Sequence, residues 1–594
     1  MHADLRSFLR DLERRGELVR VRTEVDPNQE ITVIQHRVIA AGGPALLFER
    51  VKGSAFRVVS NLFGTPRRVA MACGAPPAEL GQQLARIGHH LMPPSLKGLW
   101  RARRDLRRLS AARMRTVRRG PILEHSIEPP DLMKLPVLTC WPEDGGPFFT
   151  LPLVHTTDPY TGQGNLGIYR MQRFDAASTG MHWQIEKGGG FHFHTAARSG
   201  RPLSVSVILG GPPALTLAAV APLPEGVDER LLAAYLTGRP LDVIRRTVTG
   251  HRIPAAAEFV LEGQVFPGDR RMEGPFGDHF GHYSAAAEYP VLRVQRILAR
   301  AGAIYPATVV GKPVQEDYYI GEALQEITLP LLRMIKPAVM DLWAYPETGF
   351  HPLAVLSVRQ RYPQEALKFT LGLLGEGQLS LTKVMIAVDP EVNVRDFRAV
   401  SAALWRHLPV EGVHLLAPTA QDTLDFTGPA MNTGSRLILL ATRTAAGTLR
   451  KTAPPEPPAA GELHPGVRAA GACGPAFLVV QVKDGFSDFT SLCETLRHHE
   501  TAGRYLFHVV VSADVPVDDP MLLLWGWFTR FDPASDLHPA GRRIQGNRLL
   551  LDFPIAIDAR WKKGYPRPVA FDPAVARRVD EKWKSYGIPN KTSI

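Results

Sequence analysis

The sequence predicts a multidomain protein that mixes α/β and β structure. Its 594 residues are several times the length of a typical domain, which indicates more than one core. Short β-like runs separated by Gly and Pro fill residues 121–308, whereas helical and apolar strand-like runs alternate after residue 321. We therefore expect an N-terminal α/β domain with a basic arm over residues 1–120, a β domain over 121–320 and an α/β domain over 321–594.

The composition is that of a folded globular protein, with 45% hydrophobic and 22% charged residues. The four cysteines show neither metal-knuckle nor redox-motif spacing, so we expect neither disulfides nor structural zinc. No run reaches the roughly 18 apolar residues of a membrane span. The sequence thus predicts a cytoplasmic protein without a membrane-spanning helix.

The N-terminal region shows two clear local patterns. Within residues 1–20, apolar residues recur at helical spacing between charged ones, which predicts an amphipathic docking helix. Its apolar face consists of Leu5, Phe8, Leu9 and Leu12. Residues 45–60 form two apolar runs around a Gly-Ser pair, which predicts two strands. Both patterns suit a small α/β unit.

The formal net charge of +12 is concentrated in one segment. Residues 86–119 contain eleven Lys and Arg but only one acid, Asp105, which accounts for ten of the twelve charges. Clustered arginine is typical of nucleic-acid binding. We favour a solvated helix or an interface arm, because few aromatic residues are available for base stacking and the segment has an apolar side. That side consists of Leu96, Leu99, Leu106, Leu109 and Met114. We therefore expect no nucleic-acid partner.

The remaining elements are predicted from β-like and helical runs. In the middle region, strands are expected over Leu203–Leu209, Phe259–Phe266 and Val291–Ile297, as in an antiparallel sheet or barrel. The C-terminal region is expected to form a largely parallel sheet with helices. Its clearest elements are a helix over Glu322–Met334 and strands over Val384–Val388, Leu437–Ala441, Phe477–Val482 and Val509–Val511.

A Pro-rich tract over residues 453–466 interrupts the C-terminal region. We interpret it as an exposed loop inside that domain rather than as a domain boundary. No internal repeat is visible in the sequence.

Four segments of the middle region carry residue types suited to chemistry. They are Asn165–Arg170, Met181–Gly190, Glu225–Glu229 and Glu273–Asp278. The Gly188–Gly190 triplet after Lys187 can present backbone N–H groups to a phosphate, although such a triplet is as often a turn.

The carboxylates Glu273 and Asp278 flank a Gly-Pro-x-Gly turn. In a pocket shared with Arg170, their pKa values would be pushed apart, as proton transfer requires. Carboxylates beside a turn are more often simply exposed. The spacing alone leaves both interpretations open.

The histidines His182, His192 and His194 lie close together in sequence and invite a zinc-site interpretation. We favour another interpretation for two of them. His192 and His194 are expected as alternate residues on one face of a strand that leaves the site.

Taken in order, several blocks resemble the UbiD family of reversible decarboxylases, which use prenylated FMN. The blocks are Leu5–Arg10, Asn165–Gly190, Glu229, Glu258–Gly263 leading into Glu273–Asp278, and Thr382–Arg395. The resemblance implies an N-terminal α/β domain, a central split β-barrel that binds the flavin, and a C-terminal α/β domain used for oligomerisation. The end of the chain, residues 558–568, resembles the longer menaquinone-pathway branch of the family.

The resemblance implies a metal that joins the protein to the flavin phosphate. Asn165 and Glu229 match ligands of a divalent metal, usually Mn²⁺, which prefers oxygen donors. The family often has a histidine ligand where this sequence has Glu186. A carboxylate can replace imidazole, but its added charge beside a phosphate would call for Lys187 and a monovalent cation such as K⁺.

The same resemblance implies a set of flavin contacts along three segments. They are Ile168, Tyr169, Arg170, His182, Trp183, Gln184, Lys187 and Gly188, with Lys383 as a further phosphate contact. Pocket-shaping residues are harder to assign, and the candidates are Ile185, His279 and Ile320.

The implied reaction needs an electron sink, since CO₂ loss from an aryl or α,β-unsaturated acid leaves a carbanion that no side chain here can delocalise. Arg170 is expected to orient the carboxylate or the flavin through a pair with Glu273, and Asp278 to deliver the proton. Desolvation and repulsion from Glu273 are expected to keep Asp278 partly protonated.

We therefore predict a prenylated-FMN-dependent decarboxylase of an aromatic or α,β-unsaturated acid, with a quinone precursor as the first candidate. A flavin prenyltransferase would supply the cofactor, and a homo-oligomer is expected. The alternative is a UbiD-like flavin-binding or assembly protein without turnover, which only the Glu186 departure supports.

Overall fold

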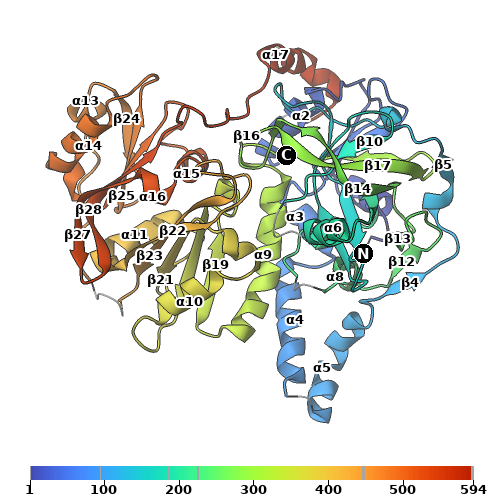
Figure 1. The fold of residues 1–594 in the computed structure, drawn as a ribbon, viewed down its shortest axis with the longest axis horizontal. Coiled ribbons are helices and arrows are strands. Elements are labelled where there is room, and N and C mark those ends of the chain that lie inside the picture. The colour runs from blue at the N-terminus through green and yellow to red at the C-terminus, as the bar shows by residue number, and fades with distance from the viewer. Residues whose placement is uncertain (1, 94, 185–187, 224–225, 444–447, 590–594) are drawn as a thin grey trace. The chain divides into compact units, whose positions relative to one another are not determined.

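The computed structural model describes residues 2–93, 95–184, 188–223, 226–443 and 448–589. The chain folds into two compact units (Figure 1). Unit 1 comprises residues 1–327 and 567–594, and unit 2 comprises residues 328–566. The chain therefore leaves unit 1 once and returns to it for its last segment, which no local sequence pattern indicated.

The N-terminal part of unit 1 is a small α/β layer. Helix α1 (Leu5–Arg14) starts at the N-cap Asp4 and buries its predicted apolar face, which confirms the amphipathic docking helix. A four-stranded sheet follows in the order β1-β2-β3-β18. Its strands are β1 (Leu18–Val21), β2 (Ala45–Phe48), β3 (Arg57–Ser60) and β18 (Ile304–Pro306). The two strands expected within residues 45–60 are confirmed.

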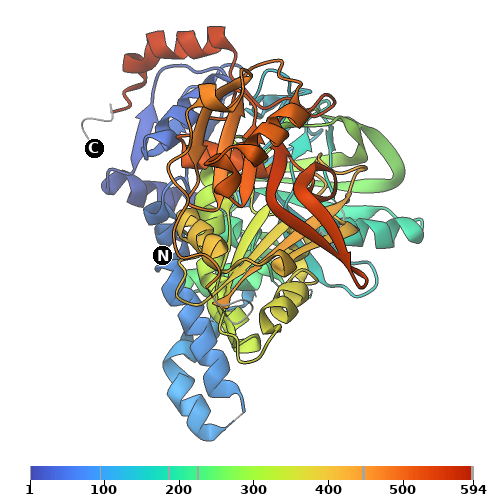
Figure 2. The same cartoon turned by 90° about the vertical axis from the view of Figure 1, so that its left-hand side faces the viewer.

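Three helices follow that sheet: α3 (Pro66–Cys73), α4 (Pro77–Leu91) and α5 (Leu96–Leu109). Helices α4 and α5 run side by side as a hairpin in both views of the molecule (Figures 1 and 2). The arginine-rich segment thus contains a helix, as its apolar side predicted. We call residues 77–109 the basic hairpin.

The middle of unit 1 is a seven-stranded antiparallel sheet. Its main path runs β10-β17-β14-β11-β7-β8, and β5 also pairs with β17. The strands are β5 (His125–Ile127), β7 (Leu153–Thr157), β8 (Gly164–Ile168), β10 (Ser178–Gly180), β11 (Leu203–Leu209), β14 (Phe259–Glu273) and β17 (Ala287–Ala299). All three strands predicted here are confirmed, while a split barrel remains a prediction.

Short elements complete this part of the fold. Helices α6 (Gly188–Arg198), α7 (Pro213–Ala218) and α8 (Glu229–Thr237) accompany the sheet, and α6 packs on β7, β8, β11 and β14. Minor strands are β4 (Met114–Thr116), β6 (Phe148–Phe149), β9 (Met171–Gln172), β12 (Leu241–Ile244), β13 (Ile253–Pro254), β15 (Phe276–Gly277) and β16 (Tyr283–Ser284). His192 and His194 lie in α6, so the expectation that they occupy a strand is wrong.

Unit 2 contains two five-stranded sheets. Helix α9 (Glu316–Ile335) begins in unit 1 and ends within the first residues of unit 2. It confirms the helix predicted over 322–334. The first sheet has the order β19-β20-β21-β23-β22 and the second the order β24-β25-β26-β28-β27. The first consists of β19 (Val339–Ala344), β20 (Leu353–Val358), β21 (Val384–Val388), β22 (Val413–Ala420) and β23 (Thr433–Ala441). The second consists of β24 (Val467–Ala472), β25 (Phe477–Val482), β26 (Phe507–Val511), β27 (Leu537–Gln545) and β28 (Arg548–Ala559).

The two sheets have the same topology. In each, the three central strands are parallel and both edge strands are antiparallel. The helices correspond as well: α10 (Glu365–Leu373) to α14 (Phe489–His498), and α11 (Phe397–His407) to α15 (Pro520–Phe528). Residues 339–441 and 467–559 therefore form a structural repeat that is not visible in the sequence.

The two repeats pack on each other reciprocally. The loop between β19 and β20 contacts α15 of the second repeat. Conversely, the loop between β24 and β25 contacts α11, where the Ala476 N–H donates to Ser401 Oγ at 3.0 Å. One apolar cluster draws residues from both sheets and from α11 and α15. The Pro-rich tract connects the two repeats within unit 2, as expected, but it is not wholly a loop, because it contains the short helix α13 (Ala460–Leu463).

The last segment of the chain completes the core of unit 1. Helix α17 (Pro573–Lys582) packs on α2 (Glu30–Ala40). The Tyr586 hydroxyl donates to Glu30 at 2.6 Å, and both side chains are buried. Val579 belongs to the main apolar cluster of the unit.

All four cysteines are free and buried, in agreement with the predicted absence of disulfides. In the part of the chain that the structure describes, no helix is both long and apolar enough to cross a membrane.

Candidate active site

Three predicted catalytic side chains meet on the antiparallel sheet of unit 1. Arg170 follows β8, Glu273 ends β14, and Asp278 follows β15. Arg170 Nε donates to Glu273 Oε1 at 3.3 Å, and Arg170 Nη1 donates to Asp278. All three side chains are buried, so the spacing that sequence left ambiguous produces a buried cluster rather than a surface turn.

The electrostatic setting of Asp278 differs from the one expected. Burial alone would raise the pKa of this carboxyl, but the Arg170 guanidinium and His279 hold it well below its usual range. Both the Nδ1 atom and the backbone N–H of His279 lie within 2.8 Å of Asp278 Oδ1. Asp278 is therefore ionised at rest, and the expectation of a partly protonated carboxyl is wrong for this state.

His182 forms the other side of the cluster. Its Nδ1 lies 2.9 Å from Glu273 Oε1, and its Nε2 lies 3.3 Å from the Gln184 amide nitrogen. Burial and the nearby Arg170 lower the pKa of His182, so its ring is neutral. A neutral ring that donates from Nδ1 and accepts at Nε2 satisfies both neighbours. The ring also packs on Tyr289, with centroids 4.2 Å apart.

Two polar atoms of the cluster have no hydrogen-bond partner within the described part of the chain. They are Arg170 Nη2 and Glu273 Oε2, and both are buried. Buried polar atoms of this kind are costly unless a ligand satisfies them. The open guanidinium nitrogen of Arg170 has the chemistry to bind a carboxylate.

Backbone contacts hold the Glu273–Asp278 turn against the sheet. The Gly274 N–H donates to Gln172 Oε1, and the Gly277 N–H donates to Asp144 Oδ1, each at 2.8 Å. Gly180 is also required, because a Cβ atom there would lie 2.2 Å from Glu273 Oε2. Sequence reasoning missed Gln172, Asp144 and Gly180, since no local pattern links them to the turn.

The predicted oxygen donors Asn165 and Glu229 also come together. Asn165 lies on β8, and Glu229 opens α8. The backbone N–H of Leu166, the residue after Asn165, donates to Glu229 Oε2 at 2.8 Å. Burial raises the pKa of Glu229 to about 7. A divalent cation would compensate the buried charge of its ionised form, so the donor chemistry fits a metal.

The third predicted metal ligand, Glu186, lies outside the described residues, as do Lys187 and Ile185. In the described ranges, no group of three or more His, Cys, Asp or Glu side chains is placed to hold a metal. The metal site predicted from Asn165, Glu186 and Glu229 therefore remains a prediction.

The glycine triplet brings the first turn of α6 close to this donor pair. A Cβ atom at Gly188 would lie 2.1 Å from Asn165 Oδ1, and one at Gly189 would lie 2.6 Å from Trp183 Nε1. The Gly189 N–H donates to the Tyr169 hydroxyl at 3.2 Å, and that hydroxyl also accepts from the Asn165 amide at 3.3 Å. Buried Trp183 Nε1 has no partner in the described structure. The triplet thus forms a close-packed cradle beside one open donor, Trp183 Nε1, which a bound cofactor could use.

Lys383 behaves differently from the other predicted flavin contacts. It belongs to unit 2, where its ammonium group is buried and lies 2.9 Å from Asp425 Oδ2. The same group lies over the Phe531 ring at 5.3 Å. Its role as a phosphate contact remains a prediction. Of the pocket candidates, His279 contacts Asp278, while Ile320 lies in an apolar cluster on α9.

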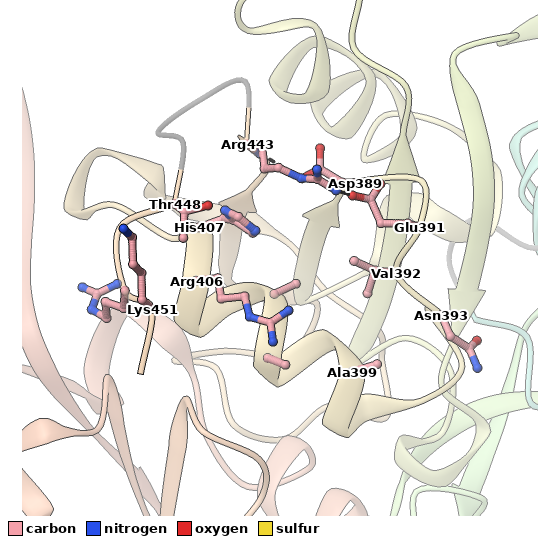
Figure 3. A pocket seen from close by; sticks show the side chains of 13 residues that line it. Asp389, Glu391, Val392, Asn393, Ala399, Arg406, His407, Arg443, Thr448 and Lys451 are labelled. Carbon is pink, nitrogen blue, oxygen red and sulfur yellow. Dashed lines mark hydrogen bonds and ion pairs between the residues drawn. The ribbon is translucent and has the colours of Figure 1, made fainter. Parts of the chain in front are cut away.

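A separate pocket of about 680 Å³ lies in unit 2, beyond the carboxyl ends of β21 and β23 (Figure 3). Arg443 on its rim pairs with Asp389 at 3.6 Å and with Glu391. None of the predicted site residues lines it. It is therefore not part of the site described above.

The site thus combines a buried arginine between two carboxylates with an amide and a carboxylate on the neighbouring elements β8 and α8. Three family models match the chain in order. They are the N-terminal, Rift-related and C-terminal domains of 3-octaprenyl-4-hydroxybenzoate carboxy-lyase, over residues 9–87, 115–313 and 318–441. The chain belongs to the UbiD family, and it is a decarboxylase of that carboxy-lyase family.

Relatives support the assignment along nearly the whole chain. A subunit of the 4-hydroxybenzoate decarboxylase of Chlamydia pneumoniae is 41% identical, with 97% of each chain covered. Among solved structures, the UbiD-class enzyme HmfF of Pelotomaculum thermopropionicum, in complex with FMN, is 29% identical with a TM-score of 0.62, covering 74% of this chain and 94% of that one. The vanillic acid decarboxylase of Sedimentibacter hydroxybenzoicus is 25% identical with a TM-score of 0.67, covering 77% and 96%.

Proposed function

We propose that this protein is a prenylated-FMN-dependent, non-oxidative decarboxylase of an aromatic or α,β-unsaturated carboxylic acid. The observation that carries the proposal is the buried Arg170, whose Nη2 is open while its other nitrogens contact Glu273 and Asp278. A charge-assisted contact from this nitrogen would fix the substrate carboxylate before it leaves as CO₂.

The residues present also fit the cofactor. HmfF has been solved with FMN and with prenylated FMN. Asn165 and Glu229 would hold the metal beside the phosphate, and Tyr169, Trp183 and the cradle at Gly188 would contact the flavin. When bound, prenylated FMN supplies the electron sink for the carbanion that CO₂ leaves behind.

The proton that replaces CO₂ is assigned to Asp278. Arg170 and His279 keep this carboxyl ionised at rest, so it must acquire a proton during the cycle. A substrate carboxylate that takes up the charge of Arg170 would weaken its hold on Asp278 and raise the pKa of that carboxyl. The partly exposed His279, hydrogen-bonded to Asp278, provides a route from solvent for that proton.

An aromatic quinone precursor is our first candidate substrate. Two observations support it: the resemblance of residues 558–568 to the menaquinone-pathway branch, and the hydroxybenzoate named for the Chlamydia pneumoniae relative and the family models. A screen of hydroxybenzoic, other aromatic and acrylic acids, with CO₂ release as the readout, tests the substrate class. We further propose a homo-oligomer, and the solved structure of an evolved dimeric form of HmfF supports this.

Turnover is expected only in protein produced together with a flavin prenyltransferase. Without the prenyl group, FMN lacks the added ring that acts as the electron sink, so protein carrying plain FMN should release no CO₂ above background. Absorbance spectra of the bound flavin provide the loading control. Full turnover with plain FMN would contradict the proposal, and loaded protein that is inactive on every acid would favour the non-catalytic alternative.

Metal affinity of the apoprotein is expected to depend on pH. Burial raises the pKa of Glu229 to about 7 from its ordinary value, so a proton must leave before the carboxylate can bind metal. Mn²⁺ affinity should therefore rise by about tenfold per pH unit below pH 7 and level off above it. Calorimetric titration at several pH values checks this slope, and the Glu229→Gln variant should bind no Mn²⁺ at any of them.

A further inference from the structure

The basic hairpin is not explained by the proposed reaction. The N-terminal family model ends at residue 87 and the central one starts at 115, so residues 88–114 lie between them. The base of the hairpin is fixed to unit 1. Arg108 donates to the backbone carbonyls of Tyr235 and Leu236, and Gln83 bridges the two helices by donating to Asp105 at 3.0 Å.

The far end of the hairpin exposes large apolar side chains. Met92 is 73% exposed, Leu96 86% and Trp100 65%, and Leu99 is 46% exposed. We call these four residues the apolar tip. Leu96, Leu99 and Trp100 lie on one face of α5 at helical spacing, opposite the buried Gly98 and Ala102. An exposed cluster of this kind marks an interaction surface.

Cations surround the apolar tip and continue along α5. The exposed ones are Lys97, Arg101, Arg103, Arg104 and Arg107. Arg103 lies over the Trp100 ring, with its guanidinium carbon 4.0 Å from the centroid. In the described part of the chain, no ion pair joins these five side chains to a carboxylate, and the acid of α5, Asp105, is turned toward Arg86 at 3.6 Å.

We propose that the basic hairpin docks the protein on an anionic lipid bilayer. Apolar and aromatic residues at the end of a basic helix match the pattern of interfacial membrane helices. At 1.5 Å per residue, Arg107 lies roughly 16 Å along α5 from Leu96. The apolar tip can therefore enter the acyl boundary while the arginines remain at the level of the lipid phosphates. This inference does not depend on the proposed reaction.

Two other partners fit the same surface less well. A second copy of the hairpin would place exposed cations against like charges, which disfavours symmetric pairing. A nucleic acid would satisfy the arginines, but it offers no apolar environment for Met92, Leu96 and Leu99, and Trp100 alone provides a stacking surface. A bilayer satisfies both the apolar and the cationic parts.

Co-sedimentation of the full-length protein with vesicles tests the proposal. The protein should bind vesicles of phosphatidylglycerol and phosphatidylcholine in equal parts, and bind pure phosphatidylcholine far more weakly. Leu96→Ser with Trp100→Ser should lower the partition coefficient at least about tenfold. Arg104→Gln with Arg107→Gln should lower it about fivefold per arginine, and only for the anionic vesicles.

A matched control is available on another exposed hairpin. Ile544 and Leu549 on β27 and β28 are also exposed, at 79% and 46%. Ile544→Ser with Leu549→Ser should leave vesicle binding unchanged. Because all four native cysteines are buried, Leu96→Cys and Ile544→Cys can each be labelled with an environment-sensitive fluorophore. Only the label at position 96 should brighten with anionic vesicles.

Three results would overturn the proposal. The first is wild-type protein that does not sediment with anionic vesicles. The second is a Leu96→Ser, Trp100→Ser variant that binds as wild type does while its thermal unfolding is unchanged. The third concerns the other two partners, when wild-type protein binds no vesicles. In that case, loss of a dimer in the variant by sedimentation velocity would favour a second copy of the chain, and tight binding of a mixed-sequence DNA duplex would favour a nucleic acid.

Discussion

Replacing Asp278 with asparagine is expected to lower turnover by about 10² to 10⁴, the contribution of a positioned general acid. Asparagine keeps the volume of the side chain and can still accept from the His279 N–H, which lies 2.7 Å from Asp278 Oδ1. The turn and the flavin contacts should therefore survive. Steady-state CO₂ release and the absorbance of bound prenylated flavin, measured on the same preparation, separate catalysis from cofactor loading.

Isotope measurements sharpen the assignment. Exchange of the substrate carboxylate with labelled CO₂ requires no proton delivery, so it should persist in Asp278→Asn. Deuterium incorporation from solvent into the product should fall together with turnover. Near wild-type rates with normal deuterium uptake would exclude Asp278 as the donor, and Glu273 would then be the group to replace.

Replacing Glu229 with alanine is expected to remove both the metal and the flavin. Loss of a group that merely supports a metal ligand costs about 10- to 100-fold in metal affinity, so loss of a ligand should cost at least that much. The buried setting that raises the pKa of Glu229 to about 7 indicates a carboxylate whose charge needs a cation. Metal analysis and flavin absorbance of the purified variant measure the two losses.

The Glu229→Gln variant separates metal binding from structure. Its amide oxygen can still accept from the Leu166 N–H, the contact of 2.8 Å that fixes α8 against β8. We expect it to unfold at the temperature of metal-free wild type and still lack metal. If either variant retains full flavin absorbance, Glu229 does not bridge the protein to the cofactor.

Local periodicity was sufficient to predict much of the fold. Helix α1 was predicted because it buries one face, and burial of one face imposes a regular spacing on apolar residues. Strand β11 was predicted as a short β-like run, and it is buried on both faces along most of its length. His192 and His194 show where periodicity fails. Their alternation with Phe191 and Phe193 resembles a strand, but packing of the segment on four strands of the sheet selects a helix.

The repeat in unit 2 was invisible because its two copies share topology but not side chains. Lys383 and Leu506 occupy equivalent positions, each accepting a backbone N–H from the neighbouring strand through its carbonyl, at 2.9 Å. One is a buried cation paired with Asp425 and the other is an apolar core residue. Hydrogen bonds between backbones form whichever side chains are present, so the side chains of the two copies can differ. No repeat is therefore visible in the sequence.

The candidate site shows what the spacing of residues along the sequence cannot predict. Arg170 and Glu273 are 103 residues apart, and only the registry of the antiparallel sheet brings them together. Resemblance to the UbiD family pointed to both residues. It did not indicate that Arg170 and His279 would keep Asp278 ionised, because that depends on distances between side chains from separate elements.

The return of the chain to unit 1 affects how the protein can fold during synthesis. Domains commonly fold in order from the N-terminus as they leave the ribosome. Here the core of unit 1 includes Val579 and Tyr586, which are translated after the whole of unit 2. Unit 2 is complete in sequence by residue 566, before those residues exist. The unit that begins first is therefore completed after unit 2, and until residues 573–586 are made, the α2 surface that they cover lacks its partner.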